Sequence, residues 1–243
     1  MEEHELLIVD WINEFIARPA ASILGWNFPA GEHLIPMHLI MATFVLLFSF
    51  IFFGWLGSRI SVETPGKIQH ILEMVIEFLH NQLEEIVGHG GKRFLNIIGT
   101  IGIFILFSNL LGLIPGMGAP TSNINVPAGC AIIVFLYYNF QGIRQQGVGK
   151  YLAHFMGPVW WLSPLMIPIE VISHLARPFS LTVRLFANIF AEELLIVVFF
   201  GLVPLFLPLP FMAYAIFGGF LQAFIFVTLT MVYLAGAVAV EDH

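Results

Sequence analysis

The 243-residue sequence is 58% hydrophobic and only 10% charged, whereas about a quarter of the residues of an ordinary soluble protein are charged. This composition excludes an ordinary soluble domain and indicates a protein that crosses a membrane several times. The net charge of −7, with lysines and arginines scattered along the chain, excludes a basic surface for nucleic acid, so no nucleic-acid partner is expected.

The first residues predict a short helix that lies along the membrane surface. Within residues 5–16, apolar side chains such as Trp11 recur at helical spacing opposite polar ones such as Asn13, a pattern typical of amphipathic interfacial helices. The acidic start MEEHE lacks the basic region of a signal peptide, so membrane insertion is expected to depend on later segments. We therefore predict an N-terminal amphipathic segment at residues 1–30 and a single membrane domain at 31–243.

Three apolar runs have the roughly 20 residues that are needed to cross the ~30 Å hydrocarbon core of a bilayer. They predict membrane-spanning helices at 37–56, 94–114 and 124–143. Between the first two, residues 64–88 combine an apolar stripe with an opposite face of glutamates and histidines. This pattern predicts an amphipathic helix with Thr64 as its N-cap and Pro65 as its first residue.

The same amphipathic segment contains Glu77 and His80, which have the Glu-x-x-His spacing of metal-binding helix bundles. Such bundles repeat the pattern on a second helix, and the sequence holds no second copy. We therefore expect neither a metal nor a cofactor. The single cysteine, Cys130, has no partner for an internal disulfide and lies in an apolar run, so a buried packing role is expected.

The last third of the chain is apolar but does not divide into 20-residue spans. Residues 160–202 and 211–240 form two long runs separated by PLFLPLP. A helix of about 30 residues is ~45 Å long, too long to stand upright in ~30 Å of hydrocarbon. The predicted fold class is therefore an all-α membrane protein with five spans, the last two forming a strongly tilted hairpin. A break of the first run at Pro178 into two spans is the alternative that length and periodicity leave open.

The basic residues predict which loops face the cytoplasm. The turn at 115–123 has none, and the loop between the first two spans and the loop after the third have six: Arg59, Lys67, Lys92, Arg93, Arg144 and Lys150. The positive-inside rule places these two loops in the cytoplasm and the N-terminus outside. With five spans, the C-terminus is cytoplasmic. We expect a multi-pass membrane protein.

Polar residues are concentrated at 170–193, in the stretch EVISHLARPFSLTVRLFANIFAEE. A charge near the bilayer centre costs at least about 2.5–3.5 kcal/mol, so such residues normally face a protein partner or a water-filled path. At 100° per residue Glu193 points to a flank, while one narrow face holds Glu170, His174, Arg177, Arg184, Asn188 and Glu192. Two interpretations stay open: a conducting path, and ion pairs that bridge helices, for instance Glu170 with Arg177 or Arg184 with Glu192.

The residue types on this face are those of a proton path. Carboxylates and histidine change their protonation and build proton relays, whereas arginine does not release its proton. A fixed cation such as Arg184 is costly where an uncharged polar residue would serve, which favours a function over a packing role. It can attract a partner carboxylate and block direct proton leakage past itself.

The stretch SLTVRLFANIFAEEL at 180–194 resembles the signature of subunit a of the F-type ATP synthase, the membrane stator subunit that passes protons to and from a rotating ring of c subunits. The same order and spacing as in that family are found for PGKIQHILEMVIEF at 65–78, NLLGLIPG at 109–116 and LQAFIFVTLTMVYL at 221–234. The resemblance covers the chain from about residue 33 onward. It implies a stator that performs no covalent chemistry itself. The implied partners are the c ring, the b subunits of the peripheral stalk, the whole synthase complex and membrane lipid. The implied location is the bacterial plasma (inner) membrane.

The resemblance also implies roles for single residues. The family's essential arginine falls on Arg184, which would face the carboxylate of each passing c subunit and separate two aqueous half-channels. Asn188 and Gln222 match the polar residues that flank this arginine. Glu193 matches the half-channel carboxylate, and Glu170 matches an acidic position at the entry of the same path.

Two departures from the family pattern leave the proton path open. Where many relatives have glycine this chain has Glu192, so either Glu192 or Glu193 is the main half-channel carboxylate. Many relatives have a histidine or an acidic residue where this chain has Ala215, and Tyr214 and Glu192 are the candidate substitutes. His174 is a further relay candidate, although a histidine hydrogen-bonded within the protein fits the sequence equally well.

Two other classes of membrane protein fit the sequence poorly. Secondary transporters show paired repeats with broken helices in both halves, and this chain has no internal repeat. An intramembrane hydrolase needs a nucleophile with its base or a set of metal ligands, yet neither Gly-x-Ser-x-Gly nor His-Glu-x-x-His occurs in the sequence.

Overall fold

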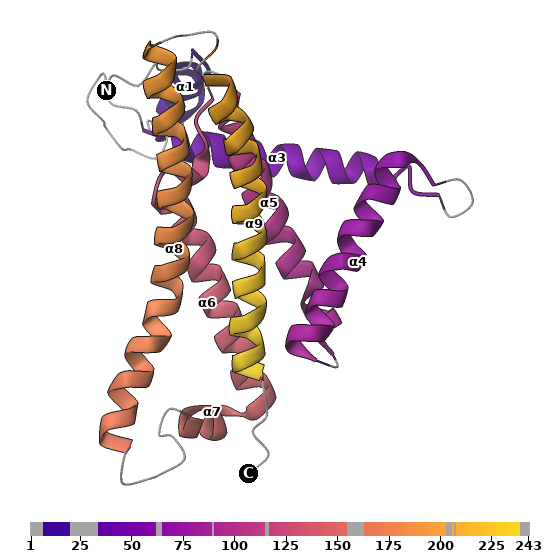
Figure 1. Ribbon diagram of the computed structural model, residues 1–243, viewed down its shortest axis with the longest axis vertical. Coiled ribbons are helices and arrows are strands. Elements are labelled where there is room, and N and C mark those ends of the chain that lie inside the picture. The colour runs from indigo at the N-terminus through magenta and orange to yellow at the C-terminus, as the bar shows by residue number, and fades with distance from the viewer. Residues whose placement is uncertain are drawn as a thin grey trace.

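The structure of the chain is a computed structural model, shown in Figure 1. It describes residues 7–19, 34–61, 65–88, 90–114, 117–154, 163–202, 206 and 208–238. Within these ranges every regular element is helical, which confirms the all-α class. The elements are α1 (Leu7–Ile12), a π-helical turn (Asn13–Ala17), α3 (Met37–Gly57), α4 (Lys67–Val87), the 3-10 helix η2 (Gly91–Phe94), α5 (Leu95–Leu111), the 3-10 helix η3 (Pro120–Ser122), α6 (Asn125–Gln146), α7 (Val148–His154), α8 (Ser163–Leu202) and α9 (Pro208–Val238).

Five helical segments in the described part of the chain are long and apolar enough to cross a membrane, which confirms the predicted number. They are Met37–Gly57, Gly91–Leu111, Asn125–Gln146, Ser163–Leu202 and Pro208–Val238. Many large apolar side chains on these helices are exposed. Such surfaces suit a lipid environment, because lipid tails are as apolar as the side chains themselves.

α8 is a single helix of 40 residues that continues through Pro168 and Pro178. The alternative of a break at Pro178 is therefore wrong. Membrane helices tolerate proline because neighbouring helices, hydroxyl side chains and ordered waters compensate for the lost backbone hydrogen bond.

The lengths of the last two helices require a strong tilt in a membrane. At 1.5 Å per residue, α8 is ~60 Å long and α9, with 31 residues, is ~46 Å long. Neither length can stand upright in a hydrocarbon core of ~30 Å. In Figure 1, α3 crosses the direction of α8 and α9 at a steep angle, so the spans do not share one direction. A membrane that α3 crosses upright would hold α8 and α9 strongly tilted.

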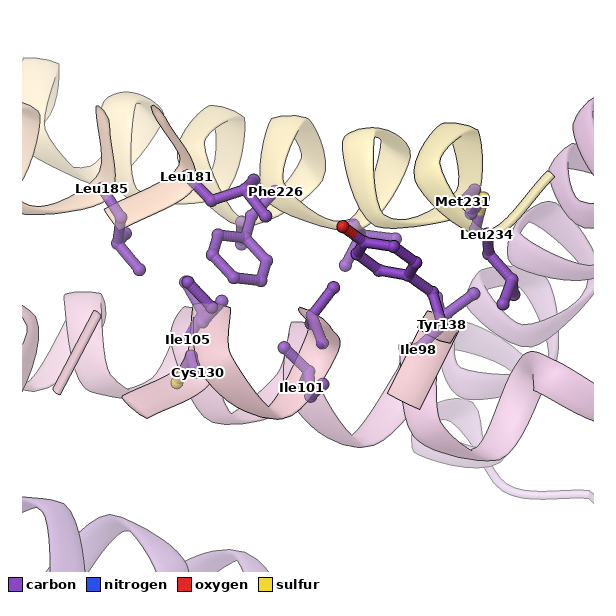
Figure 2. Packing of buried hydrophobic residues seen from close by; sticks show 14 of the residues in the cluster. Ile98, Ile101, Ile105, Cys130, Tyr138, Leu181, Leu185, Phe226, Met231 and Leu234 are labelled. Atoms are coloured by element: carbon purple, nitrogen blue, oxygen red, sulfur yellow. The ribbon is translucent and has the colours of Figure 1, made fainter. Parts of the chain in front are cut away.

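The main hydrophobic core lies between α5, α6, α8 and α9 (Figure 2). Cys130 of α6 is buried in it, as predicted. Its large side chains that are at most 1% exposed include Ile98, Ile105, Tyr138, Leu185 and Phe226. Between lipid-facing helices such packing stabilises mainly through van der Waals contact rather than through removal of apolar surface from water.

α8 and α9 form an antiparallel pair with a regular register. Successive contacts are Arg177 with Tyr233, Asn188 with Gln222, Glu192 with Gly218, and Phe199 with Phe211. Residue numbers rise along α8 as they fall along α9, so the positions of α8 that contact α9 pair with it in a fixed register.

The amphipathic helix α4 begins at Lys67, later than predicted. Gly66 is its N-cap, with an extended backbone at φ −76° and ψ 161°, so Pro65 precedes the helix instead of starting it. Thr64, the predicted N-cap, lies outside the described residues. The Gln69 side chain holds the incoming chain by hydrogen bonds to the backbone nitrogen and oxygen of Ser61, at 3.2 and 3.1 Å. These bonds hold Ser61 against the first turn of the helix.

The N-terminal helix differs from the prediction in the side chain that it buries. Asn13, expected on the polar outer face, is 4% exposed, whereas Trp11 is 55% exposed. The Asn13 amide nitrogen donates to the carbonyl oxygens of Val9 and Ile35, at 3.0 and 3.1 Å, and its oxygen accepts from the Ile35 nitrogen at 2.8 Å. These bonds fasten the N-terminal helix to the segment before α3, which explains why the amide turns inward.

Candidate functional site

Arg184 lies near the middle of α8 and is half-buried. Its Nη2 atom lies 3.4 Å from the hydroxyl of Ser180, one turn earlier. This is long compared with the 2.7–2.9 Å typical of a charge-assisted hydrogen bond. A guanidinium carries five N–H donors, so within the described part of the chain most of this donor capacity is unused.

The ion pairs considered from the sequence do not form. Among the described residues, ion pairs join His70 with Glu73, His80 with Glu84, and Lys92 with Glu84. In that part of the chain neither Arg184 nor Arg177 has a carboxylate within ion-pair distance. A cation inside a membrane requires a charged partner or water. The described residues therefore leave Arg184 available to a charge on another chain.

Asn188 and Gln222 meet beside Arg184. Asn188 is exposed one turn after the arginine, and Gln222 of α9 is 3% exposed. The Asn188 Nδ2 atom donates to Gln222 Oε1 at 2.8 Å. The bond joins α8 to α9 and holds the Asn188 amide one helical turn from Arg184.

Glu193 joins α8 to the connection between α5 and α6. Its Oε1 atom accepts a hydrogen bond from the Ala119 backbone nitrogen at 2.6 Å. Ser122 lies beside the same carboxyl group. A Cβ atom added at Gly112, at the end of α5, would come within 3.0 Å of this oxygen. The carboxyl group therefore sits in a close-fitting polar site lined by backbone and hydroxyl groups.

Two more polar side chains lie behind the connection between α5 and α6. The Thr121 hydroxyl donates to Asn109 Oδ1 at 2.7 Å, and Asn109 Nδ2 donates to the Gly219 carbonyl oxygen at 3.2 Å. Thr121 and Asn109 are buried. They link the connection at η3 to α9, close to the positions that face Glu192 and Asn188.

Glu192 packs against a glycine of α9. A Cβ atom added at Gly218 would collide with the Glu192 carboxyl group. Gly218 lies one helical turn from Ala215, which is buried. Tyr214, the other candidate substitute, is 59% exposed. Of these two candidates, the carboxylate of Glu192 lies against the part of α9 that contains Ala215.

Glu170 lies at the other end of α8 from Glu192 and Glu193. It is half-buried and stands 14 residues before Arg184, whereas Glu193 stands nine residues after it. At 1.5 Å per residue these separations are ~21 and ~14 Å along the helix. Because α8 is continuous, Arg184 lies between the two carboxylates.

His174 is buried against α6 and takes part in a hydrogen-bond cluster. Its Nε2 atom lies 2.8 Å from Asn139 Oδ1 and 3.4 Å from the Tyr138 hydroxyl. The same Asn139 oxygen accepts a hydrogen bond from the Tyr151 hydroxyl at 2.7 Å. We call these four residues, His174, Tyr138, Asn139 and Tyr151, the His174 cluster. This is the geometry of a histidine with partners inside the protein, and a relay role for it stays a prediction.

The amphipathic helix α4 contains Glu77 and His80, the pair with the Glu-x-x-His spacing of metal-binding helix bundles. His80 pairs with Glu84 at 3.7 Å, and Glu77 is exposed. Across the described ranges no group of three or more histidine, cysteine or carboxylate side chains is placed to hold an ion.

Sequence reasoning treated residues 115–123 only as a turn and missed its contacts with the site. Ala119 and Ser122 meet Glu193, which is more than 70 residues away in the chain, and Thr121 meets Asn109. The run Thr121 to Asn123 of small polar residues inside an apolar region was the available signal. It indicated a turn and gave no sign of the helix that the turn would meet.

Comparisons with known proteins agree in one family. The family described as ATP synthase A chain matches residues 8–235. A protein named ATP synthase subunit a from Solibacter usitatus (strain Ellin6076) is 54% identical over 203 residues, covering 84% of this chain and 85% of that protein. Another of that name, from Koribacter versatilis (strain Ellin345), is 43% identical over 239 residues and covers 97% of this chain and 98% of its own length. ATP synthase subunit a 1 of Syntrophotalea carbinolica is 42% identical over 241 residues, 99% of each chain.

Proposed function

Because the chain belongs to the ATP synthase subunit a family, we propose that it is the ion-translocating stator subunit of a rotary ATP synthase. In this role it provides two aqueous half-channels that load and unload carboxylates on a ring of c subunits, and Arg184 separates them. The observation that carries the proposal is the half-buried guanidinium of Arg184, which has a long hydrogen bond to Ser180 and no carboxylate partner among the described residues.

The chemistry of arginine suits the separating position. A guanidinium stays protonated at working pH, so it cannot pass a proton along. It stabilises the ionised form of a carboxylate that comes close, because an opposite charge within ~4–6 Å favours the charged form. A c subunit carboxylate would therefore lose its proton on approaching Arg184 and regain one after passing it.

The polar groups on either side of Arg184 supply the two half-channels. Glu193 and Glu192, with the polar residues behind η3, line one of them. Glu170 lies on the opposite side of Arg184 along the continuous α8, so we assign it to the other half-channel rather than to the path of Glu193. The half-buried site of Glu193, which contains the Ala119 backbone nitrogen and Ser122, supports a carboxylate held in one position for proton exchange.

The proposal includes the partners and the location that the sequence predicted. The exposed surface of α8 around Arg184 and Asn188 would face the c ring, while the b subunits of the peripheral stalk would hold the stator still. The chain would perform no covalent chemistry, and ATP synthesis would occur in other subunits of the complex. The multi-pass chain would lie in the bacterial inner membrane with its N-terminus outside and its C-terminus in the cytoplasm, as the distribution of basic residues predicts.

Replacement of Arg184 tests the proposal directly. In membrane vesicles that contain the assembled complex, Arg184→Ala is expected to abolish ATP synthesis driven by a proton gradient, because c subunit carboxylates would no longer be discharged between the half-channels. Ser180→Ala is the matched control, since it removes only the 3.4 Å contact of the guanidinium. Normal ATP synthesis driven by a proton gradient in the Arg184→Ala complex, with all subunits present, would contradict the proposal.

A further inference from the structure

A pocket at the start of α5 and the end of α6 is lined by basic and amide side chains and lies away from the Arg184 site. It has a volume of about 400 Å³ and is lined by Arg93, Tyr137, Gln141, Arg144 and Gln145. Arg93 belongs to η2, directly before α5, and Arg144 lies in the last turn of α6. We call these five residues the arginine pocket.

Both guanidiniums of the arginine pocket lack a carboxylate. Within the described residues the neighbouring Lys92 is paired with Glu84 at 3.3 Å, while neither Arg93 nor Arg144 lies within ion-pair distance of an acidic side chain. The neighbours of Arg93 are neutral. Its guanidinium lies 4.6 Å from the centre of the Phe94 ring. With the oxygen and nitrogen of the Gln145 side-chain amide exchanged, the amide oxygen accepts a hydrogen bond from Arg93 Nη1 at 2.9 Å. Two fixed cations among amide and phenol groups offer many donors and no negative charge, so the pocket fits an anion.

The apolar surface beside the pocket indicates which kind of molecule contains that anion. Tyr137, Gln141 and Arg144 follow one another at helical spacing on α6. The adjacent stripe of α6 consists of Leu136, Phe140 and Ile143, which are 61%, 59% and 39% exposed. A polar site at the end of a span, continued by an exposed apolar stripe, matches a molecule with an anionic head and hydrocarbon chains.

We propose that the arginine pocket binds the phosphate group of an anionic phospholipid, with the acyl chains lying along Leu136, Phe140 and Ile143 of α6. Basic pockets between membrane helices on the cytoplasmic side are suited to anionic head groups, and the positive-inside rule places Arg93 and Arg144 on that side. Two guanidinium forks hold a phosphate through several charge-assisted hydrogen bonds. The bound lipid would brace the start of α5 against the end of α6.

Two carboxylates near the end of the chain are competing candidates for the arginine pocket. The Gln146 amide nitrogen donates to the Ala237 carbonyl oxygen at 3.1 Å, which places the end of α9 beside the end of α6. Glu241 and Asp242 follow that end of α9 in the chain. The experiment therefore has to separate lipid phosphate from these carboxylates and from free phosphate.

Photocrosslinking of lipid to the whole purified complex tests the proposal. Phosphatidylglycerol and phosphatidylcholine carrying the same photoreactive group on an acyl chain are added separately, and labelled peptides of residues 132–146 are quantified by mass spectrometry. Phosphatidylglycerol is expected to label this segment in preference to phosphatidylcholine. The double variant Arg93→Gln/Arg144→Gln is expected to lower that labelling roughly tenfold or more. Arg59→Gln/Lys150→Gln removes the same charge from exposed basic residues outside the pocket and is expected to leave it unchanged.

Several outcomes would overturn the assignment. Equal labelling by the two lipids would show that the pocket does not select lipids by head-group charge. Loss of labelling in excess inorganic phosphate, compared with chloride at equal ionic strength, would show that a free anion is sufficient. Labelling that appears only after Glu241→Gln/Asp242→Asn would make those carboxylates the native occupant. Loss of another subunit from the double variant with unchanged lipid labelling would make the pocket a protein contact.

Discussion

His174 and Arg184 lie on the same helix, α8, but their side chains have different surroundings. His174 is buried, and its ring nitrogen has partners on α6 at 2.8 and 3.4 Å. Arg184 is half-buried with one contact at 3.4 Å, and no carboxylate pairs with it among the described residues. Buried polar groups normally have their hydrogen bonds satisfied within the protein. His174 therefore links α8 to α6, while the lack of a carboxylate beside Arg184 among the described residues supports the proposal that Arg184 meets a group on another chain.

The largest expected effect that would sharpen this comparison concerns the two neighbouring glutamates. Glu193→Gln keeps an oxygen that can accept from the Ala119 nitrogen but removes the exchangeable proton. ATP-driven proton pumping by inverted vesicles is expected to fall roughly a hundredfold, the low end for loss of a positioned proton-transfer group. Glu192→Gln is expected to slow pumping less. The reverse ranking would move the main half-channel carboxylate to Glu192.

A second effect concerns the contact between α8 and α9 at Gly218. A Cβ atom added there would collide with the Glu192 carboxyl group, so Gly218→Ala has to displace that side chain. Pumping is expected to fall roughly tenfold, because small misplacements of reacting groups are costly. Gly236→Ala is the matched control on the same helix, where an added Cβ atom meets nothing within 4 Å. Equal pumping by the two variants would remove the close fit of Glu192 from the proposal.

A third prediction addresses the His174 cluster and would break the comparison if it fails. Asn139→Ala removes the acceptor that the His174 ring and the Tyr151 hydroxyl share, and each lost hydrogen bond is worth about 0.5–1.5 kcal/mol. The thermal midpoint for loss of the chain from the complex is expected to fall, with pumping per assembled complex nearly unchanged. Asn125→Ala, at an exposed position of the same helix, is the control. Lost pumping in fully assembled complexes would instead support His174 as a relay group.

The smallest expected effect is a dependence of stability on high pH. Burial raises the pKa of the Tyr151 hydroxyl, which lies on α7 outside the spans, above its ordinary value of about 10. Since the folded-state pKa is the higher one, the stability from the neutral hydroxyl is fully present below about pH 10 and is lost as the pH rises through the folded-state value. Tyr151→Phe is therefore expected to flatten the loss of thermal stability above that pH. A parallel decline in both proteins would show that another group titrates.

Much of the fold was predictable because it depends on local composition. Apolar runs of sufficient length define the spans whatever their neighbours are. Run length favoured one long helix at 160–202 but left a break at Pro178 open, because continuity through a proline depends on compensation by surrounding groups. The inward turn of Asn13 also escaped prediction, since its partner Ile35 lies in a segment that helical spacing does not bring near.

The sequence by itself determined the five apolar spans and the placing of a fixed cation, an amide and several carboxylates along one helix. Helical periodicity sets these features, and it depends only on spacing along the chain. Only the tertiary structure decided what each polar group meets: Glu193 the Ala119 nitrogen, Glu192 the surface at Gly218, and His174 an amide of α6. Such contacts follow from packing between helices distant in sequence, and for Arg184 that packing supplies no carboxylate among the described residues.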